Sequence, residues 1–458
     1  MKKNNSGSIL EMASYGTGKF LAEFLTGAYG LMVYYFFETE LGLSGLFVSV
    51  ATIIYSIWNA VNDPLIGYAT GKSGKRKKWI ITGLVLCSVV YALIFSVPSF
   101  VSSKPGLLFA WMVVFVCAYD FCYSLWEVNY QGVFPDKFRS AEERTKAASI
   151  ATFIGVFGIA LGSVLPPLFY TYGKPETFLK SALIISGVGL AGTLLIRKGV
   201  SETPEMIQRF NRKIQEEEKT KTPSFFSSLV SSLKHREFLA LVIMLFLYQS
   251  ACMCMTSSVN YVAHGVLGFE KGSATTPIFA GMLIGALLSI LLWKNVAKRI
   301  KNNNQKLLII TCFFMALASS SMFFCNTQIQ YAIGMFVWGL GFGGYWTFMT
   351  PAMADVVDSV VVKQKRRDDG ILMGVRAFFM RLSYASQAIV FWLCHNLSGY
   401  DASVKGMQNP IARTGIKLHM SLVPGAFFLL AALVMLFLNP LNPDVVEQNK
   451  KTLKELDL

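Results

Sequence analysis

Charged residues are scarce in this 458-residue chain, and acidic residues are scarcer than basic ones. Asp, Glu, Lys and Arg together make up 15% of the sequence, whereas soluble domains carry about 25%. Hydrophobic residues make up 53% and form long blocks such as Trp79 to Val101 and Leu418 to Leu438. Each block can cross roughly 30 Å of hydrocarbon as a helix. The composition excludes an ordinary soluble protein and predicts an integral multi-pass membrane protein in a lipid bilayer.

Signals for disulfides, cofactors and secretion are also missing. The eight cysteines lie in or beside apolar blocks, and no CxxC pair occurs, so they are expected to be packing residues. Glu11 interrupts the apolar stretch that follows Lys2 and Lys3, and no small-residue cleavage site follows it. We therefore expect the first span to be retained. No cofactor is expected beyond a coupling ion.

Apolar blocks of helix length recur twelve times, and blocks of about 20 residues are too long for the strands of a membrane barrel. We predict an all-α membrane protein of twelve transmembrane helices. The predicted spans cover residues 15–37, 43–70, 79–101, 106–134, 145–172, 176–196, 236–264, 275–295, 306–325, 328–352, 370–398 and 416–438.

Basic residues gather in alternate loops. Clusters at Lys72 to Lys78, Lys294 to Lys306 and Lys363 to Arg367 fall in even-numbered loops. Because basic loops stay in the cytoplasm, both termini are predicted to be cytoplasmic, in a plasma or inner membrane. The net charge of +15 thus reflects topology, and no nucleic-acid partner is expected.

A charged segment divides the spans into six and six. We predict an N-terminal half at 1–196, a cytoplasmic linker with a charged helix at 197–235, a C-terminal half at 236–438 and a cytoplasmic tail at 439–458. Two halves with matching loop patterns indicate a pseudo-symmetric bundle around a central cavity. We expect such a chain to work as a monomer.

Ionisable residues inside spans are costly and are candidates for function. Lys19 and Glu23 in the first span are spaced i,i+4, so they share one face and can pair, for structure or for binding. Asp120 and Glu127 lie in the fourth span. Glu127 approaches the predicted membrane interface, so Asp120 is the firmer candidate.

The second span contains the sequence WNAVNDPLIG, with Asn59, Asn62 and Asp63 on adjacent turns. Pro64 cannot donate a hydrogen bond to the carbonyl of Ala60, which adds a free backbone oxygen to one carboxylate and two amides. Such oxygen donors suit Na⁺, with Asp63 and Asn62 as its ligands, and a desolvated carboxylate also suits a proton relay. The alternative is a helix kink in which Asp63 pairs with the adjacent basic loop.

In the second half the outstanding residues are Trp346 in the tenth span and Arg376 and Arg381 in the eleventh. A buried arginine needs a carboxylate or an anionic ligand. Arg381 facing Glu23 or Asp120 would balance charge, and Trp346 could stack on a sugar ring or pack in the core.

Four segments, SYGTGKFLAEF, WNAVNDPLIG with GKSGKRKKW, AYDFCYSLW and ADVVDSVVVKQKRRDDG, together carry a family resemblance. In order and spacing they resemble the glycoside-pentoside-hexuronide:cation symporter family, a melibiose permease-like branch of the major facilitator superfamily. The resemblance implies the major facilitator fold and symport of a sugar with a cation.

By motif, the resemblance makes Glu23 and Asp120 sugar-binding acids, Trp346 the tenth-span aromatic residue and Arg381 the counterpart of an eleventh-span lysine. It also makes Asn62 and Asp63 cation-site residues.

The chain departs from the family at positions that matter. Asn59 stands where the family has a second acid, and Cys117 where it has a hydroxyl of the cation site. Ser124 replaces a sugar-contacting tryptophan, and Thr152 replaces an arginine. Both the ion and the sugar are therefore left open.

We expect a secondary transporter that moves a sugar or glycoside with Na⁺ or H⁺ by alternating access. Glu23, Asp120, Trp346, Arg381 and Lys19 are the predicted substrate-binding residues. The predicted cation-coupling residues are Asp63, Asn59, Asn62 and Cys117.

A transporter of a lysolipid or another amphipathic solute, and a sensor that binds without transport, are the alternatives. An intramembrane aspartyl protease is a third possibility for Tyr119-Asp120, but its GxGD partner is absent. We expect no enzyme.

Overall fold

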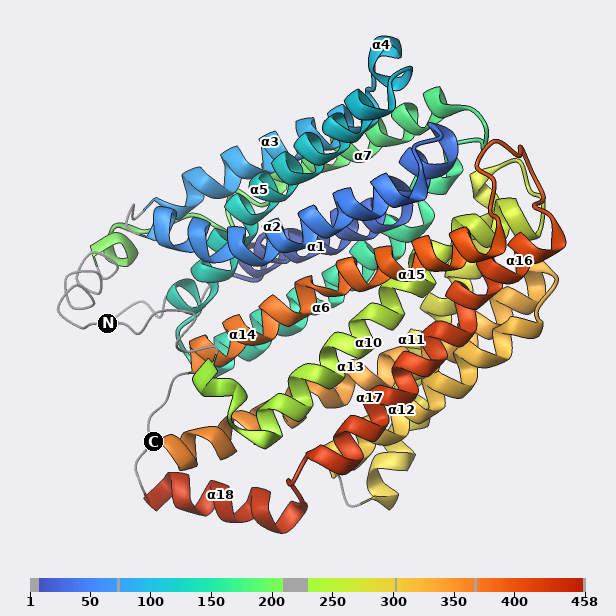
Figure 1. Ribbon diagram of the computed structural model, residues 1–458. Coiled ribbons are helices and arrows are strands. Elements are labelled where there is room, and N and C mark those ends of the chain that lie inside the picture. The colour runs from blue at the N-terminus through green and yellow to red at the C-terminus, as the bar shows by residue number, and fades with distance from the viewer. Residues whose placement is uncertain (1–7, 72–74, 209–229, 301–302, 366–368, 456–458) are drawn as a thin grey trace. The chain divides into compact units, whose positions relative to one another are not determined.

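The computed structural model describes residues 8–71, 75–208, 230–300, 303–365 and 369–455 (Figure 1). Regular structure in these residues is helical, apart from an isolated bridge between Thr171 and Lys271. The helices form two compact units, and each unit is described by itself.

Unit 1 contains the described residues up to 208 together with Glu270–Thr276. Its helices are α1 (Ile9–Tyr35), which continues as η1 (Phe36–Glu40), α2 (Gly45–Gly71), α3 (Arg76–Phe95), α4 (Ser99–Ser102), α5 (Pro105–Lys137), α6 (Ala141–Val164), η2 (Pro166–Leu168), α7 (Pro175–Leu195) and η4 (Gly272–Thr275).

Unit 2 contains the other described residues from 230 onward. Its helices are α10 (Arg236–Tyr261), η3 (Val262–Val266), α11 (Thr276–Arg299), α12 (Asn304–Ser321), η5 (Met322–Phe324), α13 (Gln328–Gln364), α14 (Asp369–Arg381), α15 (Ser383–Ser398), α16 (Pro410–Lys417), η6 (Leu418–Leu422), α17 (Val423–Leu438) and α18 (Pro443–Glu455).

Twelve long helical segments in the described residues correspond to the twelve predicted spans. Eleven of them are long and apolar enough to cross a membrane. The twelfth is α13, whose 37 residues include glycines and aromatic residues at its centre and Asp355, Asp358 and Lys363 near its end. It is longer than the predicted span 328–352 because the helix continues beyond its apolar part.

Local sequence explains several helix boundaries. Ser8 and Glu11 form a capping box that starts α1 before the predicted residue 15, and Ser140 and Glu143 do the same for α6. The predicted eleventh span is divided at Leu382 into α14 and α15. Most of the charged linker helix predicted within 197–235 lies outside the described residues.

Glycines let the helices within each unit approach closely. In unit 1, α1 and α6 form an extensive contact in which a Cβ at Gly162 would lie 2.7 Å from the carbonyl oxygen of Phe24. In unit 2, a Cβ at Gly285 of α11 would fall against the carbonyl oxygen of Phe336 in α13. Small residues at helix contacts are typical of membrane proteins, where dispersion rather than water exclusion drives packing.

The outward faces carry large apolar side chains. Phe153, Leu317 and Leu397 are 67%, 74% and 80% exposed, while Asn59, Asn62 and Asp120 are 1% exposed each. This inverts the pattern of soluble proteins and matches helices surrounded by lipid. The polar groups inside the bundle are therefore the candidates for function.

Candidate functional site

Polar side chains connect α2 and α5 along their shared interface in unit 1. Near one end, the indole Nε1 of Trp58 donates to the carbonyl oxygen of Cys117 at 3.1 Å. Toward the other end, the amide of Asn129 donates to the hydroxyl of Thr70 at 3.0 Å. Two carboxylates lie between these bonds, and they form the chemical centre of the site.

Asp120 is the first of these carboxylates. Its Oδ1 accepts a hydrogen bond from Asn59 Nδ2 at 2.5 Å, and its Oδ2 accepts one from Asn62 Nδ2 at 3.1 Å. Asn62 also donates to the backbone carbonyl of Asp120 at 3.2 Å. Because Asn59 and Asn62 are three residues apart on α2, they reach the same side chain of α5.

Asp63 is the second carboxylate and lies one residue beyond Asn62. The hydroxyl of Ser124 donates to its Oδ1 at 2.5 Å. Ser124 is one helical turn after Asp120, so both carboxylates face the same interface. By the family resemblance, Ser124 replaces a tryptophan that contacts sugar. In the structure, the Ser124 hydroxyl has a hydrogen-bond partner in Asp63.

One oxygen of this cluster is buried without a donor. The Oδ1 atom of Asn59 has no hydrogen-bond partner, while Asn59 Nδ2 also contacts the Tyr55 hydroxyl at 3.2 Å. A buried acceptor without a partner is rare and needs an explanation. Two carboxylates and a free amide oxygen form a donor set suited to a hard cation.

Lys19 and Glu23 form the ion pair that their spacing predicts, with Nζ and Oε1 2.5 Å apart. Their side chains are 46% and 31% exposed. The stem of Lys19 packs on α6, because a Cβ at Gly155 would lie 2.8 Å from its Cγ. Cys117, the other predicted site residue, lies one turn before Asp120 and contributes its carbonyl to Trp58.

Trp346 lies on α13 in unit 2, edge-on to two tyrosines. Its ring centroid is 6.2 Å from that of Tyr248 and 5.7 Å from that of Tyr345. Tyr248 and Tyr345 stack on each other and are fully buried, whereas Trp346 is only half-buried. Arg381 is the last residue of α14, directly before the interruption at Leu382.

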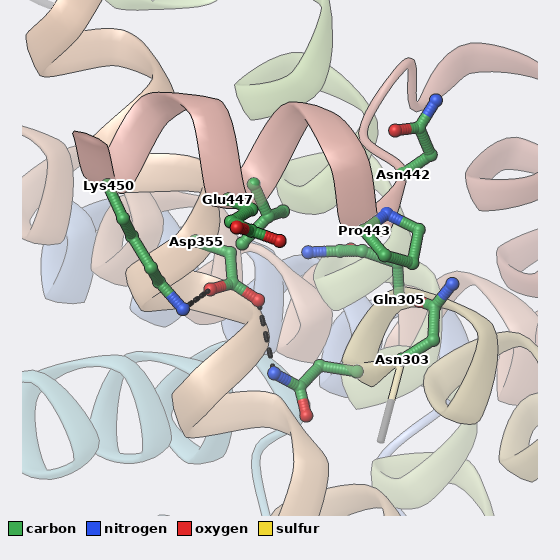
Figure 2. A pocket seen from close by; sticks show the side chains of 9 residues that line it. Asn303, Gln305, Asp355, Asn442, Pro443, Glu447 and Lys450 are labelled. Atoms are coloured by element: carbon green, nitrogen blue, oxygen red, sulfur yellow. Dashed lines mark hydrogen bonds and ion pairs between the residues drawn. The ribbon is translucent and has the colours of Figure 1, made fainter. Parts of the chain in front are cut away.

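Acids at one end of unit 2 serve structure. Glu237 accepts a hydrogen bond from Ser359 at 3.0 Å and pairs with Lys363 at 2.6 Å. Figure 2 shows Lys450 of α18 reaching Asp355 of α13, with Nζ and Oδ1 3.5 Å apart. This pair lies in a polar pocket that is lined by residues of α12, α13 and α18. The contacts attach α18, the tail helix, to the ends of the other two helices and not to their apolar centres.

His395 and His419 form a buried pair in unit 2 that the sequence did not indicate. Their Nε2 atoms lie 3.1 Å apart, and Ser258 Oγ lies 2.6 Å from His419 Nδ1. Both rings are buried, and Tyr400 stacks on His395 with centroids 4.2 Å apart. The packing of α15 against η6 brings the two histidines together, which no local spacing indicates.

We expect His419→Leu to lower the free energy of unfolding by about 2 kcal/mol, because it removes the imidazole that shares a buried Nε2–Nε2 hydrogen bond with His395. His395→Phe combined with His419→Leu should recover part of this loss, since both members of the hydrogen-bonded pair are then apolar. Thermal unfolding in detergent measures both, with His235→Gln as a control. A double variant as unstable as the sum of the single ones would contradict this reasoning.

Comparison with known proteins identifies the family. The model of the family described as "MFS/sugar transport protein" matches residues 14–442. The chain belongs to this family. It is therefore a transporter of the major facilitator superfamily, and the twelve long helical segments in its described residues have the expected fold.

Relatives of the transporter carry different substrates. The sodium-dependent lysophosphatidylcholine symporter 1 of Gallus gallus is 20% identical, with 90% of this chain and 83% of the relative covered. The lactose permease of Lactobacillus helveticus is 24% identical, with 83% and 60% covered. The inward-open xylose transporter XylE from E. coli has a TM-score of 0.63, 13% identity and coverage of 96% and 98%, which shows a shared fold.

Proposed function

We propose that this transporter is a cation-coupled symporter whose coupling ion binds at the α2–α5 interface. The observation that supports it is that two carboxylates face this interface. Asp120 accepts hydrogen bonds from Asn59 and Asn62, and Asp63 accepts one from Ser124, one helical turn after Asp120. The family's second acid in the second span is Asn59 here, and Asp120 supplies a carboxylate to the same place.

The donor set favours Na⁺ over a proton. Two nearby carboxylates repel each other when both are ionised, and a bound cation relieves that repulsion. A proton would need one acceptor only, whereas Na⁺ uses several oxygens, among which the free Oδ1 of Asn59 is available. Sodium dependence is also stated in the name of the lysophosphatidylcholine relatives.

A sugar or glycoside is the proposed substrate, with Glu23, Lys19, Trp346 and Arg381 as its contacts. The family description and the lactose permease relatives support this class. A lysolipid is the second candidate, supported by the symporter relatives that match most of the chain. If the substrate is a sugar, Asp120 positions the residues of the cation site and thereby affects the sugar site indirectly.

Uptake by the purified protein in liposomes tests the proposal. Labelled mono- and disaccharides, and separately lysophosphatidylcholine, are offered under an imposed Na⁺ gradient and under a proton gradient. Accumulation above equilibrium with Na⁺ supports the proposal and names the substrate class. Accumulation driven only by protons would reject the sodium assignment. No accumulation under either gradient would reject symport of these solutes.

Glu23→Gln should weaken solute binding roughly tenfold or more, because a charged acceptor for hydroxyl groups is lost. Stability should change by less than about 1 kcal/mol, since the Lys19–Glu23 pair is partly exposed. Isothermal titration and thermal unfolding measure the two effects, with the exposed Glu142→Gln as the matched control. Unchanged affinity would remove Glu23 from the site.

A further inference from the structure

Arg376 is a basic residue of α14 that has no ion pair among the described residues. Its Nε atom is buried and has no hydrogen-bond partner. Its Nη1 contacts only the thioether sulfur of Met373, at 4.0 Å, and a thioether is a weak acceptor. The guanidinium of Arg376 therefore lacks the acceptors that its five N–H groups require.

The position of Arg376 makes this lack costly. Arg376 is the seventh residue after the first residue of α14, a distance of roughly 10 Å along the helix. It lies within the apolar segment Leu372–Ser398. Cations inside a membrane span are rare and pair with acids or line a polar path. Because Arg376 is half-buried and its Nη1 is exposed, one edge of the guanidinium stays accessible to an incoming group.

Among the described residues, no acid of unit 2 forms an ion pair with Arg376. Between Phe238 and Leu438 the acids of unit 2 lie near helix ends or in loops. Glu237 pairs with Lys363, and Asp355 pairs with Lys450. The central turns of these helices carry no carboxylate, so a partner of Arg376 has to come from elsewhere.

An aromatic side chain of α13, Tyr345, interacts with Arg376. The Tyr345 hydroxyl is within electrostatic range of the guanidinium. Trp346 follows Tyr345 and is half-buried. Arg376 thus lies near a helix that carries a half-buried tryptophan, and a cation together with an aromatic side chain suits a solute that carries an anionic group on a less polar body.

We propose that Arg376 binds a phosphate or carboxylate group of the transported solute. Arginine presents a planar fork that matches both groups with two parallel hydrogen bonds. This assignment rests on the proposed function, because it makes Arg376 part of the transport path. It narrows the substrate class to solutes with an anionic group, such as a sugar acid or the headgroup of a lysolipid.

Matched probes isolate the anionic group in a binding experiment on the purified, full-length protein. Methyl glucuronide and methyl glucoside differ by the carboxylate. Lysophosphatidic acid and a monoacylglycerol of the same chain differ by the phosphate, and inorganic phosphate offers the anion alone. Ligand-dependent thermal stabilisation and titration give the affinities of the wild type, Arg376→Gln, Arg376→Lys and the exposed control Arg299→Gln.

The wild type should bind the anionic member of one pair more tightly than its neutral counterpart. Arg376→Gln should weaken this binding roughly tenfold or more and abolish the preference. Arg376→Lys should keep part of it, since lysine retains the charge without the fork. Arg299→Gln should behave as wild type. The pair that shows the preference identifies the source of the anion as glycoside or lipid.

Three outcomes would overturn the proposal: equal affinity of Arg376→Gln and wild type for the anionic probe, preference of the wild type for neutral probes, or binding of neither class. Because binding needs no ion gradient, these outcomes are independent of the uptake assay. Selective anion binding without uphill transport would reject symport and leave the role of Arg376 as an anion-binding residue intact.

Discussion

Asp63→Asn is expected to abolish cation-driven accumulation of the solute while leaving exchange of solute across the membrane partly intact. The substitution keeps the size of the side chain and a hydrogen-bond acceptor for Ser124. It removes the negative charge that attracts the cation, and charge-assisted interactions are roughly twice as strong as neutral ones. The ion gradient then no longer drives transport, although the solute site remains.

Proteoliposomes with a Na⁺ gradient measure accumulation, and counterflow of labelled against unlabelled solute measures exchange. Asp444→Asn, an exposed acid of α18, serves as the control and should accumulate solute normally. Uphill uptake at the wild-type level in Asp63→Asn would refute the assignment of the coupling residue. Loss of both activities would indicate that Asp63 is needed for the transport cycle itself.

Gly285→Ala should destabilise the protein by about 1–3 kcal/mol, the usual cost of overpacking a tight contact. The added Cβ would meet backbone atoms of Phe336 and Leu340, and backbone cannot rotate away as a side chain can. Helices α11 and α13 would have to separate. A melting temperature lowered by several degrees is the expected result.

Gly187→Ala is the matched control, because an added Cβ at Gly187 in α7 meets no atom within 4 Å. The same chemical change should there be neutral or stabilise by up to about 1 kcal/mol, since alanine is the better helix former. Equal melting temperatures for the two variants would show that the α11–α13 contact is looser than described.

The helices themselves were predictable, because lipid requires apolar runs of a fixed length. Capping residues moved the start of α1 from 15 to 9, and polar residues such as Lys363 extended α13 beyond the hydrocarbon. The interruption at Leu382 was not predictable, because neither proline nor glycine marks it. At this place the Ser383 hydroxyl donates to the carbonyl oxygen of Met380 at 2.6 Å, and a side chain that enters the helical hydrogen-bond ladder is a cause of helix kinks.

The sequence did not predict which helix faces pack against each other. Spacing places Asn59 and Asn62 on one side of α2, but it does not say that this side meets Asp120 and Ser124 of α5. In water, a hydrophobic stripe indicates the buried face; in lipid, the outside is as apolar as the inside, so this signal weakens. Family resemblance therefore carried most of the information about the site.

The hydrogen bonds of Asn59 and Ser124 also show why motif comparison can mislead about single residues. Read by position, Asn59 is a lost carboxylate and Ser124 is a lost aromatic contact. In the folded unit, Asn59 donates a hydrogen bond to Asp120, and Ser124 donates one to Asp63. The same place can acquire its charge from a different helix, which only the three-dimensional arrangement reveals.

Glu270–Thr276 follows α10 and η3 in the chain but folds with unit 1. The amide of Tyr172 donates to the carbonyl of Glu270 at 2.8 Å, and that of Gly272 donates to the carbonyl of Tyr170 at 3.1 Å. During synthesis, the ribosome must therefore translate all of α10 before the first unit can acquire its final segment. These hydrogen bonds of the N-terminal half can therefore form only after the first helix of the second half has been made.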